Sequence, residues 1–173
     1  MLAQTLDLYS LGGHGFLVRD RSEGESSALQ SFHSREKGAD RPPELVLVFD
    51  DPDAPPAAGE CGSTPLRLSA DRDSWVSESS PTNNFGTDST LKIKSQAGSN
   101  SRVLISFPRP DIGGGCTSVA SATLRMEATS AKEARTLVAR PASGVWTESG
   151  VTWANQPAGS GPVASVPSFD GSL

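Results

Sequence analysis

The sequence has 173 residues, of which 35% are hydrophobic and 20% are charged, and its formal net charge is −5. This length is enough for one sizeable core but not for two full domains, and the acidic balance excludes a general electrostatic grip on nucleic acid. No apolar run reaches the roughly 18 residues that would cross a membrane, so we expect no membrane insertion. The 17 glycines and 13 prolines indicate many turns and favour an all-β chain.

Short runs of strand-forming residues recur along the chain between turns rich in Gly, Pro, Ser and Asn. In chain order, the predicted strands cover residues 15–18, 45–49, 91–94, 102–107, 122–128 and 136–139. In the fifth of these, Ala122, Leu124, Met126 and Ala128 alternate with polar residues and should face the core. Residues 130–135 are helix-like but too few for more than a turn or loop. This pattern predicts an all-β fold, namely an antiparallel, jelly-roll-like β-sandwich.

A linker is predicted over residues 50–66, which read DDPDAPPAAGECGSTPL. Its Pro and Gly content favours an extended chain, which could span about 55 Å when fully stretched. The linker divides the sequence into an N-terminal strand segment, residues 1–49, and a main body, residues 67–173.

The main body contains several short motifs in a fixed order. They are DSWV at 73–76, NFG at 84–86, ATLR at 122–125, WTE at 146–148 and VTWANQP at 151–157. This series resembles the DNRLRE family, the disaggregatase-related β-sandwich modules of secreted microbial proteins, and the last two motifs are its most specific part. Some members of that family are grouped with alginate-binding carbohydrate modules. The resemblance therefore implies an extracellular or cell-surface β-sandwich module.

The N-terminal segment also resembles this family, but in rotated order. Its matching pieces are HGFLV at 14–18, FHSRE at 32–36 and PELVLV at 43–48. In the family, these pieces follow the Trp and Asn-Gln-Pro motifs and close the domain. Three explanations are open: a circularly permuted domain, one unit of a tandem array, or strands that complete the sandwich of a neighbouring copy.

The strand-donation hypothesis is the main functional prediction. A sandwich without its closing strands exposes an apolar groove and unpaired strand edges, and a second copy of the chain can fill both. The chain would then assemble head to tail into a fibre or repeat array. The expected assembly residues are Phe16, Val18, Leu45, Val46, Leu47, Val48 and Phe49. The first residues, MLAQTLDLYS, show no signal peptide, so an exported chain would begin after its signal.

The alternative prediction is a carbohydrate-binding module for an acidic polysaccharide such as alginate. Basic residues at outward-facing strand positions could form a cationic groove, and a tryptophan could stack against sugar rings. The candidate residues are Lys92, Lys94, Arg102, Arg125 and Trp75. The same basic residues could instead solubilise the surface and protect the sheet edges, and Trp146 and Trp153 fit core positions better.

We expect no enzymatic activity and no catalytic residues. The two histidines, His14 and His33, match no metal-ligand spacing, and no nucleophile elbow, phosphate-binding loop or zinc-protease motif occurs. Glu36 and Glu148 could form the carboxylate pair of a glycoside hydrolase. In the DNRLRE family, however, these positions belong to structural motifs.

A structural calcium ion and a disulfide are further expectations. Oxygen ligands for Ca²⁺ gather near the first strand of the main body, although the asparagines also suit turns. These candidate ligands are Asp71, Asp73, Asn83 and Asn84. No other cofactor is expected. The two cysteines, Cys61 and Cys116, are expected to form one disulfide in an extracellular chain.

Overall fold

The computed structural model describes residues 14–25, 27–38, 42–50, 65–110, 118–131, 135–161 and 163–169. These residues form strands joined by turns and one short 3₁₀ helix, Arg35–Lys37. The strands are β1 Phe16–Asp20, β2 Ala28–His33, β3 Glu44–Asp50, β4 Leu66–Ser69, β5 Arg72–Ser77, β6 Thr90–Ser95, β7 Ser101–Ser106, β8 Ser118–Arg125, β9 Ala128–Ala131, β10 Arg135–Pro141 and β11 Ala164–Phe169. None of the helical structure in the described residues is long and apolar enough to cross a membrane.

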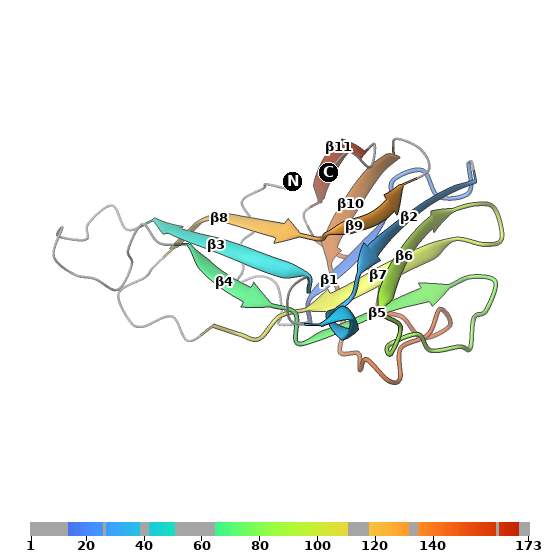
Figure 1. The fold of residues 1–173 in the computed structure, drawn as a ribbon, viewed down its shortest axis with the longest axis horizontal. Coiled ribbons are helices and arrows are strands. Elements are labelled where there is room, and N and C mark those ends of the chain that lie inside the picture. The colour runs from blue at the N-terminus through green and yellow to red at the C-terminus, as the bar shows by residue number, and fades with distance from the viewer. Residues whose placement is uncertain are drawn as a thin grey trace, which may run out of the picture.

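The strands form two antiparallel sheets. An eight-stranded sheet has the order β11-β10-β1-β7-β6-β2-β9, with β5 also paired to β7, and a three-stranded sheet has the order β4-β3-β8. In Figure 1 the larger sheet curls, and the three-stranded sheet extends away from it on the left. This sandwich-like arrangement of antiparallel strands confirms the predicted fold class.

One hydrophobic core joins the two sheets, and strict alternation along the strands builds it. On β6, Leu91 and Ile93 have no exposed surface, whereas the lysines between them are only half-buried. On β8, Ala122 and Leu124 belong to the same core, as the sequence predicted. Successive residues of a strand point to opposite faces, so apolar residues at every second position are enough to define the buried face.

The N-terminal strands are interior members of both sheets. Strand β1 lies between β10 and β7, β2 lies between β6 and β9, and β3 lies between β4 and β8. In this structure, residues 14–50 therefore complete the sandwich of their own chain, one of the two possibilities in the predicted fold. Nothing in this arrangement supports strand donation to a neighbouring copy.

The predicted assembly residues are part of this intrachain packing. Phe16, Val18, Leu45 and Leu47 lie in the main core, and Phe49 packs against it. Two further assembly residues on β3, Val46 and Val48, point to the opposite face, where Val46 is buried and Val48 is half-buried. The two apolar faces of this strand agree with its position in the middle of a sheet.

A second core cluster lies on the other face of the larger sheet. It contains Leu17, Val76, Leu104, Ala142, Trp146 and Val151, with Trp153 packed at its border. Three of these residues come from β1, β5 and β7, and the rest come from the chain that follows β10. This segment covers the outer face of the sheet, which explains why β1 is apolar on both sides.

Some predicted boundaries were wrong. Ser130 and Ala131 belong to strand β9, and Arg135 begins strand β10, so residues 130–135 are not merely a turn or loop. The predicted linker also loses its ends, because Asp50 closes β3 and Leu66 opens β4. The rest of the linker with Cys61, and Cys116 with the predicted disulfide, lie outside the described residues.

Replacing Leu47 by alanine should destabilise the fold strongly, because this side chain is fully buried in the core between the sheets. Leu47→Ala should lower the free energy of unfolding by about 2–5 kcal/mol, as measured by urea titration. The matched control is Val145→Ala, because Val145 is 79% exposed. The control should change the free energy by less than about 0.5 kcal/mol. Equal effects of the two variants would contradict the position of β3 in the core.

Candidate functional site

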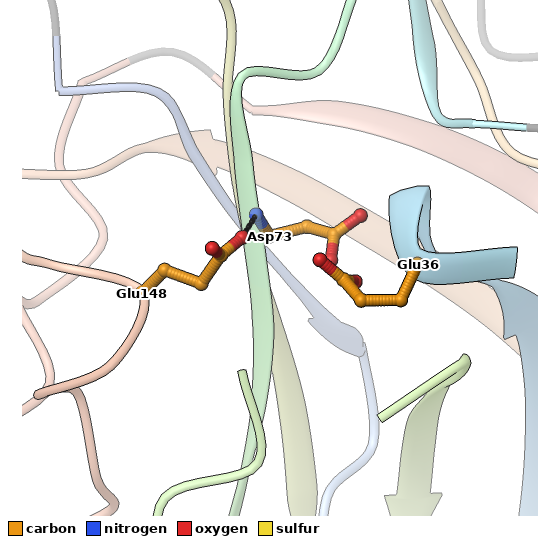
Figure 2. Close-up of side chains that lie close together, drawn as sticks. All are labelled: Glu36, Asp73 and Glu148. Atoms are coloured by element: carbon orange, nitrogen blue, oxygen red, sulfur yellow. Dashed lines mark hydrogen bonds between the residues drawn. The ribbon is translucent and has the colours of Figure 1, made fainter. Parts of the chain in front are cut away.

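A bidentate ion pair joins the N-terminal segment to the main body. Arg35 donates from Nε to Oε1 of Glu148 at 2.7 Å and from Nη2 to Oε2 at 2.8 Å. The backbone N–H of Asp73 donates to the same Oε1 at 2.9 Å. The 3₁₀ helix, β5 and the loop after β10 therefore meet at the Glu148 carboxylate, as Figure 2 shows in part.

Three carboxylates gather at this meeting point. One oxygen each from Glu36, Asp73 and Glu148 lies within 4.8 Å of the other two, and we call these residues the acidic cluster. Asp73 is only 1% exposed, and its Oδ2 accepts a hydrogen bond from the backbone N–H of Arg35 at 2.8 Å. Oδ1 of Asp73 and Oε2 of Glu36 are also buried, but no hydrogen-bond donor among the described residues contacts them.

The environment shifts the pKa values of the cluster in opposite directions. Burial, together with the negative charge of Glu36, raises the pKa of Asp73 from 3.8 to about 7. Burial also opposes ionisation of Glu148, but the hydrogen bonds from Arg35 and from the Asp73 backbone outweigh it and lower the Glu148 pKa. The bond to Glu148 in turn raises the pKa of Arg35. Glu148 is therefore the ionised partner of Arg35, while Asp73 has no equivalent counter-charge.

Local sequence features hold the cluster in place. The Ser34 hydroxyl caps the 3₁₀ helix by accepting from the backbone N–H of Glu36, and it donates to the Asp88 carbonyl at 2.6 Å. The Asn84 side chain donates to the carbonyls of Glu148 and Val151, both at 2.7 Å. These contacts explain why short motifs around positions 34 and 84 accompany the WTE motif in the sequence.

Gly86 is required by the same packing. A Cβ atom at this position would collide with the backbone carbonyl of Glu148. Only glycine therefore lets the turn after Asn84 approach the loop that carries Glu148.

The acidic cluster does not have the features of a glycoside hydrolase site. Glu36 and Glu148 do meet, as the rejected catalytic hypothesis would require. However, Glu148 is fully engaged by Arg35 and the Asp73 backbone, and the third carboxylate is almost completely buried. An acid–base pair needs room for a sugar between its carboxylates, whereas these oxygens lie within 4.8 Å of one another.

Of the four predicted calcium ligands, only Asp73 lies in the cluster. Asp71 contacts Arg72 at 3.7 Å. Asn84 is occupied by two backbone carbonyls, and Asn83 is an exposed turn residue whose N–H bonds to the Ser80 carbonyl. The other two members, Glu36 and Glu148, were named only as a catalytic pair.

The tryptophans offer little flat surface for stacking on a sugar. The Trp75 ring is stacked on Phe85 at 3.9 Å, and the Lys92 ammonium lies 4.4 Å from its centroid, so both ring faces are covered. Trp146 is 5% exposed and belongs to the second core cluster. Trp153 is half-buried and has Arg102 over its ring at 4.4 Å.

The four predicted basic residues do not form one surface. Lys92 and Lys94 share one side of β6, and neither contacts a carboxylate among the described residues; Lys94 donates to the Ser99 hydroxyl at 2.9 Å. Arg102 lies on the neighbouring strand β7, next to Ser101, which pairs with Lys94, but successive side chains of a strand point to opposite faces. There Arg102 makes two short hydrogen bonds to Glu23. Arg125 on β8 lies 3.6 Å from Glu44. Both arginines therefore pair with a carboxylate, which each shares with a second arginine, whereas the two lysines have no carboxylate partner among the described residues.

Comparison with known families assigns the chain to a class. The model of carbohydrate-binding module family 96 matches residues 64–171, which contain strands β4 to β11. The chain belongs to this carbohydrate-binding module family, and such modules are non-catalytic. Searches of curated proteins and of solved structures gave no match. Strands β1 to β3 lie outside the matched region, although they complete both of its sheets.

The Arg35–Glu148 pair should contribute measurably to stability. Glu148→Gln removes the charge that both Arg35 hydrogen bonds depend on and should lower the free energy of unfolding by about 1–2 kcal/mol. Glu44→Gln is a matched control, because Glu44 has a similar exposure, 26% against 21%, but pairs with Arg67 at the surface. The control should cost less than about 1 kcal/mol. A smaller loss for Glu148→Gln than for the control would contradict a structural role for the Arg35–Glu148 pair.

Proposed function

We propose that the protein binds an acidic polysaccharide, of which alginate is an example, without cleaving it. Membership of a carbohydrate-binding module family supports a polysaccharide partner. The observation that supports an acidic one is the pair of lysines on β6, whose ammonium groups contact no carboxylate among the described residues. Uronic acid carboxylates are the natural counter-charge for such groups.

The geometry of β6 suits an extended polymer. Thr90, Lys92 and Lys94 are half-buried and lie on the side of the strand opposite the core residues Leu91 and Ile93. Side chains two residues apart on a strand are separated by about 6.5–7 Å. The two ammonium groups can therefore contact successive charges of one polymer chain. Recognition would depend on charge and hydrogen bonds rather than on stacking, since both faces of Trp75 are covered.

The resemblance to DNRLRE modules supports the same substrate class, because some of those modules are grouped with alginate-binding ones. It also supports a location outside the cell or at its surface, where such polymers are found. We include this location in the proposal.

Removing both lysines should weaken binding. Lys92→Ala with Lys94→Ala should reduce the affinity for alginate about tenfold, which corresponds to roughly 1.4 kcal/mol, in calorimetric titrations at low salt. Raising the salt to about 0.5 M should also lower the affinity of the wild-type protein for alginate, because the charges lie at the surface. Lys92→Arg with Lys94→Arg keeps the charge and should keep most of the affinity.

The matched control removes the same charge elsewhere. Arg67 lies on β4 in the three-stranded sheet and Arg109 follows β7, and both are exposed, so Arg67→Ala with Arg109→Ala should leave the affinity nearly unchanged. Melting curves must accompany the lysine variants, because Lys92 also covers Trp75. Equal losses in the two double variants, or no binding of uronic acid polymers by the wild type, would overturn the proposal.

Exchange of the N-terminal strands between copies is a second candidate function. Strands β1, β2 and β3 are each inserted between strands of the main body of their own chain, and the same contacts could form between two chains. Chains linked in this way would form a fibre or repeat array. This candidate is independent of polysaccharide binding.

An engineered disulfide can distinguish the two arrangements. Val18 and Val103 face each other on β1 and β7, at a separation typical of cross-strand cystines. Val18→Cys with Val103→Cys, in a chain whose Cys61 and Cys116 are serine, should give covalent oligomers after oxidation if strands are exchanged. Non-reducing electrophoresis reads the result. Oxidised protein that stays entirely monomeric would contradict strand exchange.

A further inference from the structure

Two carboxylate oxygens in the acidic cluster lack the partners that buried oxygens need. Oδ1 of Asp73 and Oε2 of Glu36 are both buried, and no N–H or hydroxyl group of the described residues donates to them; the polar group that Asp73 faces is the Glu36 carboxyl. Asp73 is 1% exposed, and Figure 2 shows its carboxyl group directed toward that of Glu36. Leaving such oxygens unpaired is costly, so a cation between them would remove an unfavourable feature of the fold.

The spacing of the oxygens suits one metal ion. One oxygen from each of Glu36, Asp73 and Glu148 lies within 4.8 Å of the other two. Oxygens on opposite sides of a calcium ion are about 4.6–5.2 Å apart, because each lies about 2.3–2.6 Å from the ion. All three carboxylates can therefore contact the same ion without a large movement of the backbone.

The chemistry of the ligands favours calcium. The cluster contains only carboxylates, and zinc prefers His and Cys ligands. Magnesium requires a nearly ideal octahedron, whereas calcium accepts irregular sets of oxygens completed by water. Water can reach the site, because the side chains of Glu36 and Glu148 are 22% and 21% exposed.

We propose that Glu36, Asp73 and Glu148 form a calcium site that fastens the N-terminal segment to the carbohydrate-binding module. The ion would connect the 3₁₀ helix after β2 with β5 and with the loop after β10. This inference is separate from the polysaccharide site on β6.

Arg35 limits the affinity of this site. Its guanidinium holds Glu148 and also lies 3.1 Å from Oε1 of Glu36, so it competes with a cation for both carboxylates. The Arg35 side chain is 38% exposed and can move toward solvent when the ion binds. Three carboxylates against one guanidinium still leave a net negative charge. We therefore expect a dissociation constant of about 10⁻⁴–10⁻³ M, which is typical of extracellular calcium modules.

Melting curves with added salts test the site. About 10 mM CaCl₂ should raise the melting temperature of the wild-type protein by roughly 3–10 °C. The same concentration of MgCl₂ should raise it by much less. Asp73→Asn keeps the size of the side chain and its bond to the Arg35 backbone, but it should abolish the calcium response.

The control and the second variant keep the test decisive. Asp71→Asn removes a neighbouring carboxylate that contacts Arg72 instead, so this variant should respond to calcium like the wild type. If Asp73→Asn does not fold, Glu36→Gln should show the same loss of response, since its side chain is partly exposed. A wild-type shift that is absent, or equal for calcium and magnesium, would overturn the proposal. A full calcium response in Asp73→Asn or Glu36→Gln would also overturn it.

Discussion

The fold depends on the pairing of the N-terminal strands on both of their edges. Without β1, the β10–β11 pair loses its hydrogen-bonded neighbour, and without β2, strand β9 has no partner among the described strands. Without β3, strands β4 and β8 are likewise unpaired. Residues 14–50 also supply Phe16, Leu45 and Leu47 to the core. Unpaired backbone groups and exposed apolar surface are both costly, so the region that matches the family model is incomplete without this segment.

The sequence was most informative where the apolar pattern was strong. The apolar run at residues 45–49 predicted β3, and the alternation in residues 122–128 predicted the β8–β9 region. A strand that is buried on one or both faces needs apolar residues at regular positions, and this pattern is visible in the sequence. Strand β2 gave no such trace, since Gln30 is fully buried within it and interrupts the apolar pattern. Strand β4 was not predicted: Leu66 was assigned to the linker, and residues 67–69 were placed in the main body without a strand, because this strand has only four residues. Short or polar strands are defined by their partners, which a single sequence does not display.

The acidic cluster was largely beyond prediction for a related reason. Arg35 and Glu148 are separated by 113 positions, and no local periodicity connects them. The motifs FHSRE and WTE did indicate that these residues matter, but not that they meet. Arg35 and Glu148 meet because β2 lies beside β6, which places the 3₁₀ helix near the start of β5. For the basic residues, the outward positions on strands were predicted, but the sequence did not show that Arg102 pairs with Glu23 and Arg125 with Glu44.

The interior position of β1 also constrains how the chain folds during synthesis. Phe16 pairs with Ile105 on one side and with Pro141 on the other, so the first described strand acquires its last neighbour only when most of the chain has been made. Until then its apolar faces and strand edges are unprotected at the ribosome. Such long-range pairing slows folding and exposes surface that can aggregate. The prolines between β3 and β4 in the sequence disfavour a competing strand there, which favours late pairing of the early segment with its own partners.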